Sequence, residues 1–143
     1  MITFFVPLLS LFIAQIIKIF TAKPFAITRI VGSGGMPSSH AAFVSSLSTL
    51  IGLRHGFNSD LFAVVAIFSL IIIYDAGGVR RAVGKQANVL NHLLQNLDLS
   101  KLDQEKKFIR EDLRELIGHT PYEVLVGTAL GVILAVIFQL YLL

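Results

Sequence analysis

The chain has 143 residues, of which 55% are hydrophobic and 15% are charged, and its mean hydropathy is +0.76. This composition lies outside the range of soluble globular domains and indicates an integral membrane protein with a single domain. The net charge of +3 is too small to favour nucleic-acid binding, and the absence of cysteine excludes disulfide frameworks, thiolate catalysis and cysteine-ligated metal sites.

Four apolar stretches predict an all-α membrane domain that covers residues 1–143. The first and last, residues 2–20 and 121–143, contain charge-free runs close to the ~20 residues that a spanning helix needs. The two between them, residues 37–54 and 60–79, have shorter charge-free cores and must include polar neighbours to cross ~30 Å of hydrocarbon. The first stretch lacks the basic start and the cleavage site of a signal peptide, so we expect it to be retained.

Between the third and fourth stretches, residues 82–118 have the pattern of two amphipathic helices. Apolar residues recur there at helical spacing, at Val83, Ala87, Leu90, Leu94 and Leu97 and again at Ile109, Leu113, Leu116 and Ile117. We expect these helices to form a hairpin on the cytoplasmic surface of the membrane, with the charged residues as its solvated face.

The basic residues predict how the chain crosses the membrane. Lys18, Lys23 and Arg29 follow the first stretch. Residues 80–118 carry eight basic residues, whereas the loop between the second and third stretches has only Arg54. Because basic loops stay in the cytoplasm, we expect a multi-pass protein of a bacterial cell membrane with both termini outside. The cytoplasmic face would then hold the ends of the first and third stretches and the starts of the second and fourth.

The first polar cluster at that face is residues 32–40, with the sequence GSGGMPSSH. Glycines such as Gly35 let the backbone approach a ligand closely, and a helix start at Ser38 and Ser39 offers unpaired N–H groups to an anion. His40 is then placed to donate a proton to a departing oxygen. The alternative is structural: a serine caps the helix and His40 lies at the membrane interface.

The second cluster is residues 75–81, with the sequence DAGGVRR. Arg80 and Arg81 are explained by the positive-inside rule as membrane anchors. Asp75 is not required by any topological rule. It favours a second interpretation, in which Asp75 orients an arginine whose planar guanidinium binds phosphate oxygens.

The third cluster is residues 118–123, with the sequence GHTPYE. A carboxylate four residues after a histidine can hold one imidazole nitrogen and leave the other free as nucleophile or base, which makes Glu123 the partner of His119. The competing interpretation treats Thr120, Pro121 and Glu123 as a helix N-cap, a first-turn proline and a capping box. It explains Glu123 but gives His119 no role.

Together, the two histidines, the carboxylate, the glycine- and serine-rich nest and the basic side chains indicate phosphoryl transfer. Basic groups bind a tetrahedral anion, one histidine attacks the phosphorus, and the other protonates the leaving oxygen. Asp75 and Glu123 are too few and too dispersed to predict a magnesium site, so we expect no metal and no cofactor.

At these motifs the sequence resembles the divergent, small membrane branch of the type 2 phosphatidic acid phosphatase superfamily, which is related to the vanadium-dependent haloperoxidases. The resemblance spans nearly the whole chain. It implies that His40 in the motif PSSH is the general acid and that Ser38 and Ser39 lie near the phosphate. It also implies that His119 is the nucleophile and is paired with Glu123.

The chain departs from the superfamily pattern of KxxxxxxRP, then PSGH, then SRxxxxxHxxxD. Ser39 replaces a glycine, Glu123 replaces an aspartate, and the residue six before His119 is not arginine. The first motif is incomplete as well. The phosphate-binding charge would then come from these basic residues: Arg80, Arg81, Arg114, Lys18 and Lys23.

The resemblance implies a metal-independent lipid phosphate phosphatase that works through a phosphohistidine at the cytoplasmic membrane face. Its substrate would be a membrane lipid phosphate and not nucleic acid. A bundle of four spans is smaller than is usual in the superfamily, and a homo-oligomer that completes the pocket is therefore one of the expectations. Two alternatives remain: a non-catalytic membrane protein that binds phospholipid headgroups or a partner, and a small lipid carrier.

Overall fold

The computed structural model describes residues 2–21, 35–96 and 118–142, and the regular structure in them is entirely helical. The elements are α1 (Ile2–Thr21), α2 (Ser39–His55), α3 (Asp60–Tyr74), the π-helical segment η2 (Asp75–Val79), α4 (Arg80–Asn96) and α6 (Pro121–Leu142). The predicted all-α class is confirmed. The second helix of the predicted hairpin, Lys23 and Arg114 lie outside the described residues.

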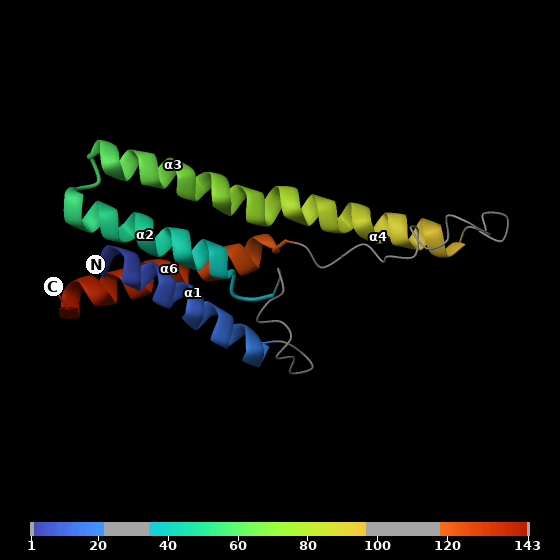
Figure 1. Cartoon of the computed structure of the whole chain (residues 1–143), viewed down its shortest axis with the longest axis horizontal. Coiled ribbons are helices and arrows are strands. Elements are labelled where there is room, and N and C mark those ends of the chain that lie inside the picture. The colour runs from blue at the N-terminus through green and yellow to red at the C-terminus, as the bar shows by residue number, and fades with distance from the viewer. Residues whose placement is uncertain (1, 22–34, 97–117, 143) are drawn as a thin grey trace.

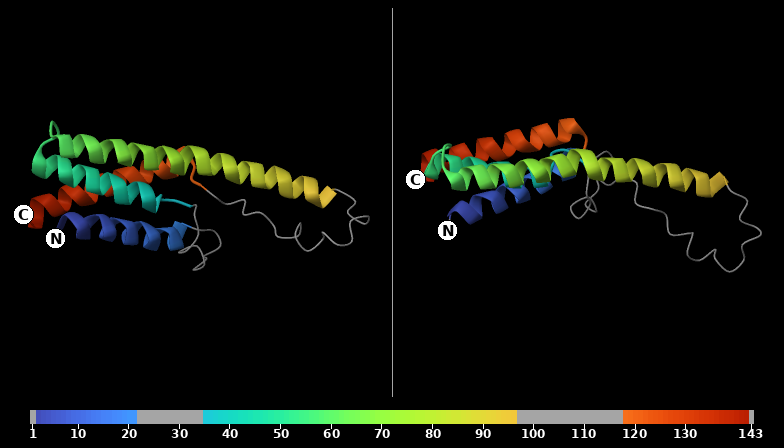
Figure 2. Two further views of the ribbon diagram at one scale, coloured as in Figure 1. Left: turned by 45° about the horizontal axis from the view of Figure 1, so that its top comes forward. Right: turned by 90° about the horizontal axis from the view of Figure 1, so that it is seen from above.

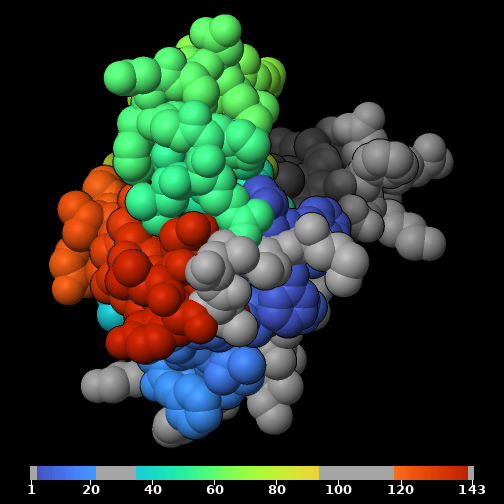
Figure 3. Space-filling view, turned by 90° about the vertical axis from the view of Figure 1, so that its left-hand side faces the viewer, coloured from blue at the N-terminus to red at the C-terminus, as the bar shows by residue number. Residues whose placement is uncertain are grey.

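Helices α1, α2, α3 and α6 form a bundle in which α2 is central and packs against the other three (Figures 1 and 2). The end of α1, the start of α2, η2 and the start of α6 lie at one end of this bundle (Figure 1). Figure 3 looks onto the opposite end, where α6 finishes and α2 turns into α3. The order of the apolar stretches predicted this meeting of four helix ends. The described residues of all three polar clusters lie there.

Three helices in the described part of the chain, rather than the four expected, are long and apolar enough to cross a membrane. They are Thr3–Thr21, Asp60–Leu93 and Pro121–Tyr141. Helix α2, which covers most of the expected stretch 37–54, is shorter and rich in hydroxyl side chains. Three of these hydroxyls donate to backbone carbonyls, as Ser46 Oγ does to Phe43 O at 2.9 Å. Because α2 is surrounded by other helices, it needs less apolar surface than a helix that faces lipid.

Small residues on α6 allow its close approach to α2. Gly127, Gly131 and Ala135 lie four residues apart on one face of α6 and are buried. A Cβ atom added at Gly127 would collide with the backbone of Ser38, and one added at Gly131 would collide with Ala42. Ser45 Oγ also donates to the backbone oxygen of Thr128 at 3.1 Å. This spacing of small residues is typical of packed membrane helices, and it brings the start of α2 against the start of α6.

Helices α3 and α4 are joined without a break through η2 and run on in one direction (Figures 1 and 2). The sequence had instead predicted a third span that ends at residue 79 and a separate hairpin on the membrane surface from residue 82. The structure differs because no proline interrupts this region. Gly77 and Gly78 are absorbed in a π-helical turn, and α4 therefore extends beyond the bundle (Figure 1).

Candidate functional site

Glu123, in the first turn of α6, has two roles, and one of them involves His119, which lies two residues before the helix. Glu123 Oε2 accepts from the backbone N–H of Thr120 at 2.9 Å, and Thr120 Oγ1 accepts from the N–H of Glu123 at 3.3 Å, which is a capping box. The same carboxylate oxygen lies 3.3 Å from His119 Nδ1. The two interpretations of this motif are therefore compatible, because one carboxylate caps the helix and contacts the imidazole.

The π-helical segment η2 fixes the backbone of His119. The His119 N–H donates to the carbonyl oxygen of Ala76 at 2.9 Å. Gly118, with φ at +97°, lies so close to the backbone of Arg80 and Arg81 that a Cβ atom there would overlap it. A glycine is therefore required, both for the left-handed conformation and for the contact. Single π-helical turns inside α-helices are often found at functional sites, and here one supports the candidate nucleophile.

The start of α2 is held against the same turn. Ser38 caps α2, since its Oγ accepts from the N–H of Ala41 at 3.4 Å, and its own N–H donates to the carbonyl oxygen of Glu123 at 3.0 Å. Thr21 at the end of α1 donates to the carbonyl oxygen of Met36, in the loop before Ser38. The role of Ser38 in the described structure is thus to cap α2 and to join it to α6.

Ser39 and Lys18 place a buried cation beside this junction. Lys18 is only 2% exposed, and its Nζ donates to Ser39 Oγ at 3.3 Å. Lys18 also interacts electrostatically with Glu123 and His119. A buried ammonium group in an apolar helix is costly unless an anion compensates it, so Lys18 is a candidate functional residue.

His40 and Arg80 lie at the exposed rim of the site. His40 is exposed and interacts electrostatically with Arg80, Lys18, Asp75 and His119. Arg80 Nε donates to Asp75 Oδ2 at 2.6 Å, and both side chains are partly exposed. The carboxylate therefore holds the guanidinium close to His40, and within residues 2–21, 35–96 and 118–142 no other hydrogen bond of the guanidinium is seen, which leaves its remaining N–H groups as candidate donors to an anion.

The imidazole of His119 is in the state that a nucleophile requires. Burial lowers the pKa of His119, and the charge of Lys18 lowers it further, whereas Glu123 acts in the opposite direction. The ring is therefore neutral at pH 7. With Nδ1–H directed to Glu123, the free lone pair is on Nε2, which is buried and has no hydrogen-bond partner in the described structure.

The structure thus brings together residues from all three motifs and from α1. His119, Glu123, Ser39, His40 and Lys18 surround the junction of α2 and α6, with Arg80 and Asp75 at its rim. Gly35 lies in the loop before α2 with φ at +86°. Arg81 is half-buried, and its backbone lies against Gly118.

Sequence reasoning missed the part played by η2, whose Ala76 carbonyl anchors His119. The signal for it was present. A glycine pair directly after a long apolar run is poorly suited to a regular helix and often marks a close approach of two backbones.

Comparisons with known proteins identify the family of the chain. Residues 2–134 match the model of the family described as "Divergent PAP2 family". The chain is 38% identical to the protein named "Uncharacterized membrane protein YuiD" from Bacillus subtilis (strain 168), and the match covers 94% of each chain. No solved structure matches. Since the family model covers most of the chain, the protein belongs to the divergent PAP2 family of membrane proteins.

Proposed function

We propose that this protein removes the terminal phosphate from a membrane lipid, without a metal, by way of a phosphohistidine on His119. The observation that carries the proposal is the orphaned Nε2 of His119. This atom is buried, and the positive charge of Lys18 acts on the ring. The ring is held by the Glu123 carboxylate at its other nitrogen, Nδ1. A buried imidazole nitrogen without a partner is unfavourable in a purely structural role and suits a nucleophile.

In the first step, the Nε2 lone pair of His119 attacks the phosphorus. The N–P bond forms as the bond between phosphorus and the lipid oxygen breaks. His40 takes up a proton when the bound phosphate anion offsets the charges of Arg80 and Lys18, and it gives this proton to the lipid oxygen, which releases the lipid alcohol. In the second step, neutral His40 takes a proton from water. The hydroxide oxygen attacks the phosphorus, the N–P bond breaks, and inorganic phosphate leaves with His119 neutral again.

The phosphate oxygens would be held by the buried Lys18 and by Arg80. Lys18 has only Ser39 as a hydrogen-bond acceptor in the described structure, so two of its three N–H donors are available to an anion. Arg80 is bound to Asp75 through Nε, and the other N–H groups of its guanidinium would donate to the phosphate oxygens. Charges fixed in this way stabilise the transition state because they need no reorganisation when the anion forms.

Lipid is the favoured substrate class because of where the site lies. It is formed at one end of a bundle whose outer surface is apolar, with exposed phenylalanine, leucine and isoleucine side chains along α1, α3 and α6. A phosphate on a lipid chain is delivered to such a site at the membrane interface. A soluble phosphate ester would gain nothing from these apolar helices.

The test is release of inorganic phosphate from a panel of lipid phosphates by the purified full chain in detergent, with a chelator present. We expect turnover by the wild type and none by His119→Ala. His55→Ala is the matched control, since His55 is an exposed histidine at the far end of α2. Equal rates for wild type and His119→Ala, or no release from any lipid in the panel, would refute the proposal.

A second candidate, binding of a phospholipid headgroup without hydrolysis, is favoured by the pair between Asp75 and Arg80. This pair neutralises part of the charge that a phosphatase would direct at phosphate. Vanadate separates the two functions. A five-coordinate adduct bonded to His119 would support catalysis, and competition with phosphate without such a bond would support binding alone.

A further inference from the structure

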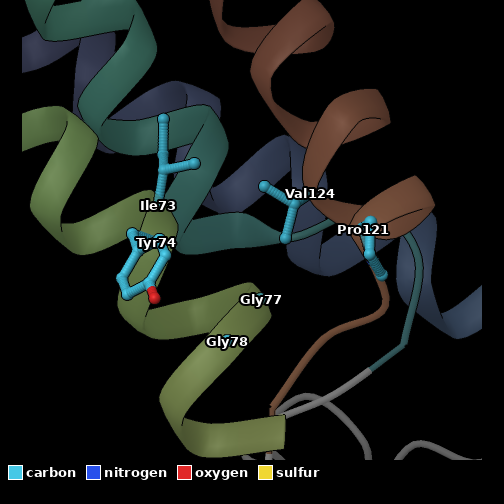
Figure 4. A pocket seen from close by; sticks show the side chains of 6 residues that line it. All are labelled: Ile73, Tyr74, Gly77, Gly78, Pro121 and Val124. Atoms are coloured by element: carbon cyan, nitrogen blue, oxygen red, sulfur yellow. The ribbon is translucent and has the colours of Figure 1, made fainter.

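A groove of about 280 Å³ lies between the end of α3 and the start of α6, next to the candidate site (Figure 4). Its lining is almost wholly apolar and consists of Ile73, Tyr74, Gly77, Gly78, Pro121 and Val124. The side chains from α3 form one wall, those from α6 face them across the groove, and the two glycines of η2 lie between (Figure 4).

The groove exists because η2 has no side chains at two successive positions. A Cβ atom added at Gly78 would meet only the ring of Tyr74, at 3.8 Å, which is ordinary contact. A Cβ atom at Gly77 would come within 3.3 Å of Val124 Cγ2. A larger side chain at Gly78 would therefore fill the groove without a backbone collision.

The groove is lined by residues that are close neighbours of the candidate site along the chain. Pro121 and Val124 belong to the same turn of α6 as Glu123, and Gly77 follows Ala76, the residue that accepts the N–H of His119. Arg80, which directly follows η2, thus lies near a surface that carries almost no polar group. A ligand that complements both must have an anionic head and an apolar chain.

The groove also opens toward the surface that an apolar chain would occupy. Its α3 wall continues into exposed apolar residues, including Leu70 and Ile71 at 65% and 57% exposure. These residues belong to the candidate span Asp60–Leu93. A hydrocarbon chain can therefore enter the groove from the side without crossing a polar region.

We infer that the groove between α3 and α6 binds the first segment of the hydrocarbon chain of a lipid whose phosphate lies at His119. The inference rests on the proposed function and adds a determinant of specificity to it. The chain segment nearest the phosphate contacts Tyr74 and Val124, and the absence of a side chain at Gly78 makes room for it.

The first experiment measures binding without turnover. Purified full-length protein is photolabelled with hexadecyl phosphate that carries a diazirine near the phosphate end of its chain, and the labelled residues are mapped by mass spectrometry. We expect labels at the end of α3 and the start of α6. Labels spread along the exposed faces of α1, α3 and α6 without preference for the groove would overturn the inference, and this wild-type pattern decides the matter even if a variant fails to fold.

Gly78→Leu should reduce this labelling about tenfold, since apolar pockets discriminate by roughly this factor per group gained or lost. Ala63→Leu places the same leucine side chain at an exposed position of α3 away from the groove and should not reduce the labelling. Undiminished labelling of a folded Gly78→Leu protein would contradict the inference.

Turnover then separates this inference from the proposed function. In Gly78→Leu, the ratio of kcat/KM for hexadecyl phosphate to kcat/KM for phenyl phosphate should fall about tenfold. Labelling in the groove without hydrolysis of either ester would refute the phosphatase and keep the groove as a lipid site. Hydrolysis of hexadecyl phosphate with labelling elsewhere would keep the phosphatase and refute the groove.

Discussion

His119 donates its backbone N–H to the carbonyl oxygen of Ala76 at 2.9 Å, so the candidate nucleophile just before α6 is held by the π-helical turn that follows α3. The side chain of His119 is held separately by Glu123. Backbone and ring are thus fixed by different parts of the chain, and each support can be removed without the other.

The backbone support is tested by Gly118→Ala. A non-glycine residue at positive φ costs about 1–2 kcal/mol. The added Cβ would also overlap the backbone of Arg81, so we expect a larger loss of unfolding free energy and a loss of turnover. Thermal unfolding in detergent measures the first quantity.

Gly56→Ala is the matched control for Gly118→Ala. Gly56 also has positive φ, +89°, but an added Cβ would find no atom within 4 Å. This variant should show the conformational cost alone and keep its activity. Equal destabilisation by the two variants would mean that the contact between Gly118 and Arg81 has no energetic weight.

Glu123→Gln separates the capping role of the carboxylate from its catalytic role. The amide oxygen can still accept from the N–H of Thr120, so we expect the unfolding free energy to change by less than about 1 kcal/mol. The lost charge no longer orients the imidazole of His119, and we expect kcat to fall by about 10²-fold. Glu123→Ala should lower both quantities, and a Glu123→Gln enzyme with wild-type kcat would show that the carboxylate only caps α6.

Lys18→Met tests whether the buried ammonium group binds phosphate. Methionine keeps the apolar contacts of the stem, so the fold should be as stable as the wild type or more stable, because no buried cation has to be desolvated. Inhibition by inorganic phosphate should weaken about 10- to 100-fold, as for loss of a charged hydrogen bond. Ser39→Ala keeps the charge and should weaken inhibition less. Unchanged phosphate inhibition in a folded Lys18→Met protein would exclude this role.

The titration of His119 gives a prediction with a defined sign. Burial and Lys18 lower its pKa, so its ring signals in an NMR titration should shift at a pH below the ~6.5 of a free histidine. The neutral ring is therefore kept under mildly acidic conditions, and its contribution to stability is lost as the pH falls below ~6.5. Lys18→Met should raise the pKa of His119, and Glu123→Gln should lower it. A midpoint above 6.5 would contradict the burial of this ring.

The meeting of the three motifs could be predicted from the sequence, because it follows from the order of the apolar stretches. The pairing of His119 with Glu123 followed from their spacing, and the same spacing also predicted the capping box. What the sequence left as alternatives proved to be one arrangement, since one carboxylate oxygen has more than one lone pair and Glu123 Oε2 makes both contacts.

Other features depend on packing and could not be predicted in the same way. Hydropathy assumes that a spanning helix faces lipid, whereas α2 is enclosed by three helices and can be rich in serine. The helix end expected near residue 79 depends on whether the glycine pair ends the helix or takes part in a π-helical turn that continues it. The outcome depends on the contact between η2 and the segment that leads into α6. This contact joins residues more than forty positions apart, such as Ala76 and His119, so it cannot be predicted from local sequence.

The central claim is that His119 Nε2 forms a bond to phosphorus, and the most direct measurement is a rapid quench of the full-length protein with a lipid labelled in its phosphate. Mass spectrometry of the quenched protein under basic conditions should find phosphate on the ring of His119 in the wild type. More of it should accumulate in His40→Ala when the leaving group needs no proton, because water is then not activated. Hydrolysis of the lipid with no phosphate on His119, or with phosphate on another residue, would contradict the account.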